Sequence, residues 1–202
     1  MELNTRSGQT VEKRAATQPV AVDGMTVAGY AAVFNSPADI GGMWQEVIAP
    51  GAFTETLRSD NDVLALYSHE IERLLGRQSS GTLRLSQDER GLSVEIDLPD
   101  TTDGRDVATL IKRGDLKGMS FGFCVTHDEW DETVTPPKRT VHAVELREVT
   151  ITASPAYEDT ECGMRSREQA RKEREQREER KQHNQEGYLR RKAEQEHRFR
   201  NI

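Results

Sequence analysis

Cysteine and aromatic residues are scarce in this sequence of 202 residues, and long apolar runs are missing. Its two cysteines, Cys124 and Cys162, are too few for a disulfide scaffold or a structural zinc site. No apolar stretch approaches the roughly 20 residues that span a bilayer, and the first residues contain no apolar signal core. These absences exclude membrane-spanning and disulfide-rich secreted classes, so we expect a soluble intracellular protein.

Charged residues make up 31% of the chain, and their two signs are unevenly distributed. From residue 165 to the end there are 13 Lys/Arg and 8 Glu, which leaves 15 Lys/Arg and 27 Asp/Glu for the rest. The body therefore carries about −12 and the tail about +5, which together give the net charge of −7. We expect a flexible segment at 1–20, a folded domain at 21–160, and a charged tail at 161–202. The tail has no apolar stripe, which predicts a disordered or partly helical segment.

Apolar residues at alternating positions, together with short continuous apolar runs, predict about seven strands in the body. The expected strands are 25–34, 44–48, 63–67, 82–86, 92–98, 120–126 and 139–152. Short helices are expected near 53–59 and at 105–112, inserted between strands without regular alternation. This order argues against a doubly wound parallel sheet. It favours an α+β fold, namely a mostly antiparallel closed β-barrel of about seven strands flanked by short helices, with the charged C-terminal tail attached.

Motifs for metal, phosphate and nucleic-acid chemistry are missing. The five histidines form no HExxH pattern, and no paired CxxC spacing occurs. Gly41 and Gly42 are not followed by the Lys-Ser/Thr of a phosphate loop. The body is acidic, and the basic tail is interleaved with glutamate and poor in aromatics that could stack on bases. We therefore expect no metal or other cofactor, and nucleic-acid binding is disfavoured.

Two polar residues at strand ends could support nucleophilic catalysis, which needs a hydroxyl or thiol, a base and a group that orients the base. His69 follows the apolar run 63–67. Ser120 lies between Gly118 and Gly122, whose small size leaves room for a substrate backbone. Taken singly, each residue is better explained as an ordinary polar residue at the end of a strand.

Six short motifs follow one another between about residues 20 and 160. They are Ala32–Ser36, Glu46–Phe53, Leu66–His69, Leu75–Arg77, Arg113–Phe123, and Glu148–Ile151 with Pro155–Tyr157. As an ordered set they resemble the prohead (head maturation) proteases of tailed phages, which are serine peptidases distantly similar to the herpesvirus assembly proteases. The resemblance does not extend to the tail.

The resemblance implies a β-barrel core wrapped by helices, with Ser120 as nucleophile and His69 as general base. The third member of the triad is a second histidine on a late strand in the herpesvirus enzymes, whereas the phage family places an acidic residue there. Glu148 lies in the matching Glu-Val-Thr stretch and is the first candidate. Glu145 is the second candidate, and His142 is the third.

Strand alternation places Glu145 and Glu148 on opposite faces, so only one of them is expected to meet His69. We prefer Glu148 because alternation puts Leu146 and Thr150 on its face, where they could line the site.

The expected chemistry is acyl transfer, in which His69 takes the proton of Ser120 and backbone N–H groups, helped by Arg77, stabilise the oxyanion. Cys124 lies in an apolar run and is expected to be a buried strand residue, because buried cysteine commonly behaves as a small hydrophobe.

The family implies cleavage of the scaffold segment and precursor of the major capsid protein, and of the protease itself, inside the assembling procapsid in the host cytoplasm. Self-association is left open. One alternative is an inactive scaffolding or capsid-assembly protein with the same fold. Another is a peptide-binding module that adds a strand to a sheet edge.

Overall fold

The computed structural model describes residues 11–16 and 20–153, and then 167–168, 171–172, 174–177, 179–181, 183 and 185. The chain divides into two compact units, Met1–Cys162 and Gly163–Ile202. The described residues of the second unit are helical, and Lys172 forms an ion pair of 3.1 Å with Glu168 one turn earlier. Cys162 and the motif 155–157 lie outside the described residues.

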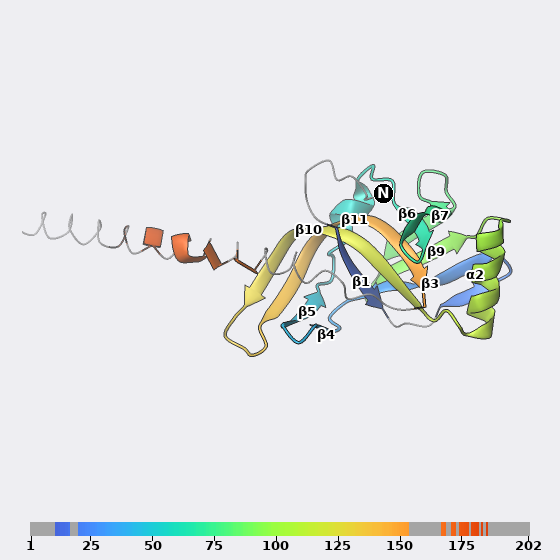
Figure 1. The fold of residues 1–202 in the computed structure, drawn as a ribbon. Helices are drawn as coiled ribbons and strands as arrows, with labels where there is room; N and C mark the ends of the chain where they lie inside the picture. Colours follow the sequence, from blue (N-terminus) through green and yellow to red (C-terminus); the bar gives the residue numbers. More distant parts are fainter. Residues whose placement is uncertain are drawn as a thin grey trace, which may run out of the picture. The chain divides into compact units, whose positions relative to one another are not determined.

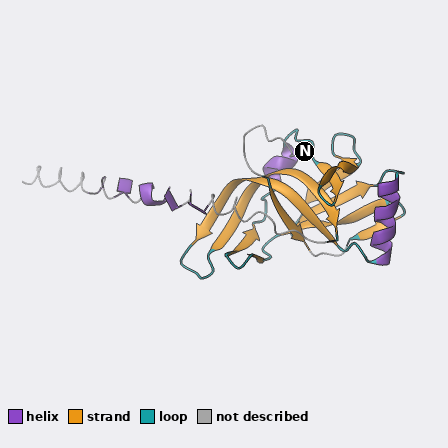
Figure 2. Cartoon of the chain, in the orientation of Figure 1, coloured by secondary structure: helices purple, strands orange, loops and turns teal. Residues whose placement is uncertain are grey.

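The described residues of the first unit form two β-sheets and two helices (Figures 1 and 2). The larger sheet follows the order β1 (Glu12–Ala16), β10 (Gly118–Asp131), β11 (Lys138–Thr152), β5 (Trp44–Ile48) and β4 (Ala38–Ile40), with β6 (Leu64–Tyr67) and β7 (Glu70–Arg77) branching from β11. The smaller sheet is antiparallel, in the order β2 (Ala21–Asp23), β3 (Thr26–Val33), β9 (Gly91–Asp97) and β8 (Leu83–Gln87). The helices are α1 (Thr54–Arg58) and α2 (Thr102–Arg113).

The hairpin of β10 and β11 joins the parts of the larger sheet. β10 pairs with β11 in antiparallel fashion along almost the whole of both strands. The other edge of β11 pairs with two strands in parallel, β5 near its start and β6 near its end. The end that carries β6 also carries the residues of the candidate site.

The expectation of a closed, mostly antiparallel barrel is wrong, although the unit is α+β and mostly strands. The larger sheet is mixed, because β5 and β6 run parallel to β11. A barrel closes only when its edge strands pair, and within the described residues β1 and β4 do not pair with each other. Residues 11–16 and 20–153 contain eleven strands instead of about seven, and the additional ones are β1, β2, β4 and β7. All four carry charged residues in place of a clear apolar alternation, so they could not be distinguished from loops in the sequence.

Helix α2 is confirmed, with signals at both ends that explain its length. The Thr101 hydroxyl accepts a hydrogen bond from the Gly104 N–H (3.3 Å), which satisfies one free donor of the first turn. Gly114 ends the helix in the left-handed conformation (φ 79°), as is typical of a helix C-terminus. Val107 and Ile111 are buried on one face of the helix.

Alternation along β10 separates an apolar face from a polar one. Phe121 and Phe123 point into the core, where their rings stack with centroids 4.8 Å apart. Val149 and Ile151 of β11 belong to the same core, together with residues of the smaller sheet. Because side chains alternate along a strand, Ser120 and Gly122 lie on the opposite face of β10.

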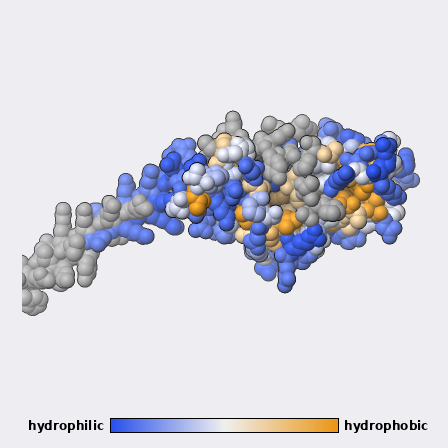
Figure 3. Space-filling view, turned by 90° about the horizontal axis from the view of Figure 1, so that it is seen from below, coloured by the Kyte–Doolittle hydropathy of each residue, from blue (hydrophilic) through white to orange (hydrophobic). Residues whose placement is uncertain are grey.

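The surface is mostly hydrophilic on the face drawn in Figure 3, where apolar residues form small separate patches. Among the described residues, the exposed large hydrophobic side chains are Met43, Leu74 and Val134, which lie on three separate parts of the chain. In the described part of the chain, no helix has the length and apolar character needed to cross a membrane.

Candidate active site

The register of β10 and β11 places four site residues on one face of the larger sheet. Ser120 lies opposite Thr150, and Gly122 lies opposite Glu148. Directly opposite residues of an antiparallel pair project from the same face, and residues two apart share that face. Ser120, Thr150 and Glu148 are all at most 1% exposed. The predicted nucleophile and the preferred third triad residue are therefore buried neighbours.

His69 reaches this face from the turn that joins β6 to β7. Tyr67 pairs with Glu70, so Ser68 and His69 form a two-residue hairpin loop. Both have positive φ (53° and 61°), as in a type I′ turn, which normally selects asparagine and glycine. The His69 N–H donates to the Thr150 hydroxyl (2.9 Å), so the strained turn is tied to β11 beside Ser120.

An imidazole–carboxylate pair forms the centre of the site. His69 Nδ1 lies 2.5 Å from Glu148 Oε1, and the carboxylate is almost wholly buried. A carboxylate accepts hydrogen bonds, so this contact selects the Nδ1–H tautomer of a neutral imidazole and leaves Nε2 as the acceptor. Nε2 is buried and has no hydrogen-bond partner among the described residues. In this arrangement the carboxylate can hold the imidazole through Nδ1–H while Nε2 can accept a proton.

Gly122 provides the space that the Glu148 side chain occupies. A Cβ at position 122 would lie 2.6 Å from Glu148 Oε1 and 3.0 Å from its Cγ. Real Cβ atoms do not approach other atoms so closely, so any larger residue would displace the carboxylate. The second glycine of the motif around Ser120 therefore has a specific role beside the imidazole–carboxylate pair.

A β-bulge at Arg147 overturns the argument from strict alternation. Gly122 pairs with Glu148, but the next residue, Phe123, pairs with Leu146, so Arg147 is the extra residue. Leu146 consequently faces the core, opposite Phe123, and not the side of Glu148. The Leu146 N–H within the bulge donates to the Thr56 hydroxyl of α1 (3.0 Å).

Glu145 lies opposite Cys124, which shares the Ser120 face of β10, so the expectation that Glu145 and Glu148 lie on opposite faces is wrong. Glu145 nevertheless accepts from Arg147 (2.7 Å) and Asn61 (3.3 Å), whereas Glu148 is the residue at His69.

Ser120 itself makes a different contact from the one that catalysis requires. Its hydroxyl donates to the backbone oxygen of Arg14 in β1 (2.6 Å), because β1 pairs with β10 so that Ala15 lies opposite Ser120. The structure thus brings His69 and Glu148 together and places Ser120 on the same face, with its hydroxyl directed to β1.

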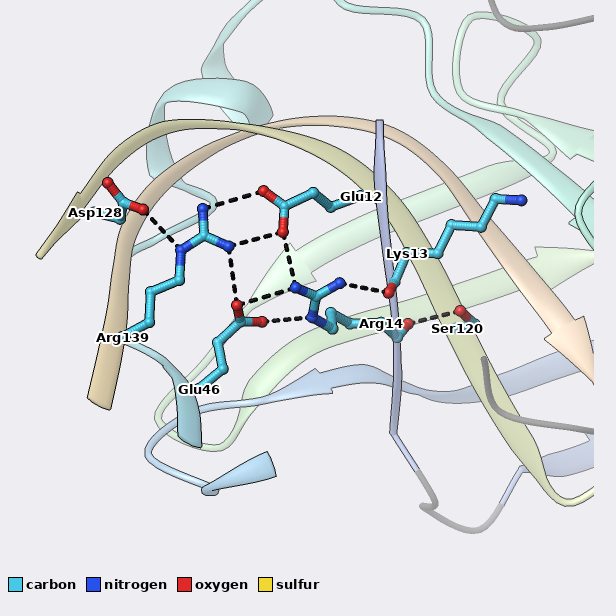
Figure 4. Close-up of polar contacts among 7 residues, drawn as sticks. All are labelled: Glu12, Lys13, Arg14, Glu46, Ser120, Asp128 and Arg139. Atoms are coloured by element: carbon cyan, nitrogen blue, oxygen red, sulfur yellow. Dashed lines mark hydrogen bonds and ion pairs between the residues drawn. The ribbon is translucent and has the colours of Figure 1, made fainter. Parts of the chain in front are cut away.

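A buried cluster of charged side chains lies on the other face of the sheet, beneath the arch of β10 and β11 (Figure 4). It consists of Glu12, Arg14, Glu46, Asp128 and Arg139. Arg14 binds Glu46 (2.6 Å) and Glu12 (2.8 Å), and Arg139 binds both of these carboxylates and Asp128. Nothing in the sequence analysis indicated this cluster, because its members lie on four strands and form no motif.

Both guanidinium groups of the cluster stay charged. Burial by itself lowers the pKa of Arg14, but the adjacent carboxylates of Glu46 and Glu12 outweigh it and raise the pKa above the ordinary arginine value. The pKa of Arg139 is raised in the same way, because its bonds to Glu12 and its proximity to Glu46 and Asp128 outweigh burial. Two cations and three carboxylates therefore share this space.

The remaining sequence candidates lie in other environments. His142 Nε2 is 3.4 Å from Glu129, and strand spacing puts His142 about 20 Å along β11 from Glu148. Arg77, expected at the oxyanion, forms a 2.7 Å ion pair with Asp62. Cys124 is fully buried, and burial raises the pKa of its thiol, which disfavours the nucleophilic thiolate.

No group of three or more histidine, cysteine, aspartate or glutamate side chains suited to a metal ion occurs within the described residues.

Comparison with known proteins connects this geometry to a family. A family model described as caudovirus prohead serine protease matches residues 9–175. A prohead protease of Enterobacteria phage HK97 is 33% identical over 134 residues, which cover 64% of this chain and 55% of that protein. A prohead protease of Escherichia phage T5 is 30% identical over 97 residues, covering 48% of this chain and 43% of that protein.

The chain thus spans about half the length of the curated relatives that it matches. No solved structure matches it. The family model nevertheless covers most of the sequence, including Ser120, His69 and Glu148. The chain belongs to the caudovirus prohead serine protease family.

Proposed function

We propose that this protein is a serine endopeptidase in which Ser120 is the nucleophile, His69 the general base and Glu148 the residue that orients and stabilises the imidazole. The observation that carries the proposal is the 2.5 Å contact between His69 Nδ1 and Glu148, on the same sheet face as Ser120. Membership of a serine protease family supports the same assignment.

The chemistry proceeds by acyl transfer. His69 Nε2 accepts the Ser120 proton as the hydroxyl oxygen attacks the scissile carbonyl carbon, and Glu148 stabilises the imidazolium through Nδ1–H. The imidazolium then gives its proton to the leaving amine, which breaks the peptide bond and leaves an acyl-enzyme. Water, deprotonated by His69, attacks the ester, releases the acid and restores the Ser120 hydroxyl.

The substrates we propose are the precursor of the major capsid protein with its scaffold segment, and the protease itself, in the assembling procapsid. The prohead proteases among the relatives support this assignment. The charged tail would tether the enzyme to these subunits, which raises its local concentration and drives cleavage inside the shell. The domain boundaries at 21–160 and 161–202 remain predictions.

A second candidate is an inactive capsid-assembly protein with the same fold. It is favoured by one observation, that the Ser120 hydroxyl binds the Arg14 carbonyl oxygen. The two candidates differ in whether Ser120 reacts as a nucleophile, so one chemical experiment separates them.

The first prediction concerns the reactivity of Ser120. A fluorophosphonate probe should label the wild-type protein, and Ser120→Ala and His69→Ala should abolish labelling. Glu148→Gln should slow it by about 10²-fold or more, because the amide can present its N–H₂ to the imidazole and select the wrong tautomer. In-gel fluorescence against time measures the rates.

The matched control is Glu145→Gln, which changes an acidic residue on the same strand that does not contact His69. It should label at close to the wild-type rate. An equal loss of labelling rate in Glu145→Gln and Glu148→Gln would contradict the assignment of Glu148. Wild-type protein that stays unlabelled would favour the inactive assembly protein.

The second prediction concerns the space beside Glu148. Gly122→Ala should slow labelling by about 10- to 100-fold, because the new methyl group displaces the carboxylate from its position at His69. Gly118→Ala is the comparison on the same strand, since its Cβ would lie 3.3 Å from the Ala16 oxygen, a tight contact that a shift of a few tenths of an ångström relieves, against 2.6 Å at position 122. If both variants label equally fast while circular dichroism shows both folded, the space at Gly122 has no bearing on the site.

The third prediction concerns the turn that holds His69. Thr150→Val keeps the shape of the side chain but removes the oxygen that accepts the His69 N–H. A residue with positive φ costs about 1–3 kcal/mol and is kept only by its surroundings, so the turn should relax and labelling should slow about tenfold or more. Thr150→Ser restores the acceptor and should recover most of the rate. A valine variant as fast as wild type would show that the hydrogen bond does not position His69.

A further inference from the structure

The Ser120 hydroxyl has one proton, and in this structure it is directed away from the general base. It donates to the Arg14 carbonyl oxygen at 2.6 Å. His69 Nε2, which must receive that proton in catalysis, is buried without a hydrogen-bond partner in the described part of the chain. The proton of the proposed nucleophile is thus given to β1, while the nitrogen proposed to receive it has no partner among the described residues.

Two features fix the Arg14 carbonyl in this position. The first is the pairing of β1 with β10, in which Ala15 lies opposite Ser120. The second is the Arg14 side chain, which projects to the other face and binds Glu46 through two nitrogens (2.6 and 3.1 Å). Glu12, on the same strand, binds Arg139 of β11 (2.7 Å). Figure 4 shows this continuous path from the charged cluster through Arg14 to Ser120.

The strand β1 is at an edge of the sheet, and its only strand partner among the described residues is β10. It can therefore separate without breaking the pairing of β10 with β11, which holds the rest of the site. Its contacts on the core face are largely ion pairs, and buried ion pairs specify one arrangement more than they add to stability. An edge strand held in this way is suited to being released.

We infer that β1 is an intramolecular latch, in which Arg14 is the positioning residue that holds the Ser120 proton away from His69. The inference rests on the proposed function and names the regulation of the same site. When β1 separates from β10, the hydroxyl loses its acceptor and rotates so that its proton is donated to His69 Nε2. The charged cluster sets how readily this happens, so the enzyme is restrained until its N-terminal strand is displaced.

A reversible crosslink tests the latch within one protein. Ala16 and Met119 lie directly opposite each other in β1 and β10. Cross-strand Cα atoms are about 4.5–5.5 Å apart, within the range that a disulfide bridges. In a Cys162→Ser background, Ala16→Cys/Met119→Cys should label with fluorophosphonate at least tenfold more slowly when oxidised than when reduced. Each single cysteine variant should label at the same rate after oxidation as after reduction.

A second variant loosens the latch without altering the net charge of the cluster. Glu12→Gln/Arg14→Leu removes one charge of each sign and leaves the Arg14 carbonyl in the chain. It should label at least threefold faster than wild type and remain dependent on His69. The control is Arg84→Leu/Asp97→Asn, which removes an exposed ion pair (2.6 Å) from the smaller sheet and should label at the wild-type rate.

The outcomes distinguish a failure of the latch from a failure of the peptidase assignment. Equal labelling of the oxidised and reduced crosslink variant would overturn the latch and leave the peptidase assignment standing. A folded Glu12→Gln/Arg14→Leu variant that labels no faster than wild type would also overturn the latch. If the cluster only stabilised the fold, its disruption would slow labelling and not speed it up. If no form is labelled in a Ser120-dependent manner, the proposed function itself fails and the latch with it.

Discussion

The pairing of β10 with β11 is the constraint on which the site depends. It sets Ser120 opposite Thr150 and Gly122 opposite Glu148, so the residues that His69 and Arg14 contact lie together on one face. A shift by one residue would move these side chains to the core face. The bulge at Arg147 lies directly before Glu148 in the chain, and the Leu146 N–H next to it is satisfied by the Thr56 hydroxyl, so the register at Glu148 is kept despite the extra residue. The fold around the hairpin serves to bring the His69 turn and β1 to this register.

Several parts of the site reduce stability and are retained by their surroundings. Ser68 and His69 adopt positive φ, at a cost of about 1–3 kcal/mol each. Glu148 is buried with one carboxylate oxygen unpartnered in the described part of the chain, and burying a polar atom without a hydrogen bond is costly. The cluster around Arg14 and Glu46 buries charges that an apolar core would not contain. Such strain concentrates at functional sites, and here it surrounds Ser120 on both faces of the sheet.

The sequence predicted what depends on local pattern. The strands with clear apolar alternation and helix α2 with Gly114 at its end are confirmed, whereas the roles of His69 and Ser120 stay predictions. The family was predicted from its ordered motifs and is confirmed by the family model. The pairing of strands could not be predicted, because parallel contacts of β5 and β6 with β11 depend on the path of the chain and not on periodicity. For this reason the prediction of a closed, mostly antiparallel barrel was wrong.

The same limit applies within the site. A bulge cannot be inferred from alternation, so Glu145 and Leu146 were assigned to the wrong faces. The roles of Thr150 and Arg14 depend on a turn and an edge strand whose residues carry no recognisable signal, since Ser-His is an unusual pair for a type I′ turn. Gly122 could have been identified more fully, because a second glycine two residues after a nucleophile predicts a close neighbour on that face.

The most direct test of the central claim is a crystal structure of the protein after reaction with the fluorophosphonate. The account predicts phosphorus bonded to Ser120 Oγ, with His69 Nε2 within about 3.2 Å of that oxygen and Nδ1 still on Glu148. Phosphorus on another residue, or a Ser120 adduct with the His69 ring remote from it, would contradict the claim that this face of the β10–β11 hairpin is a catalytic site.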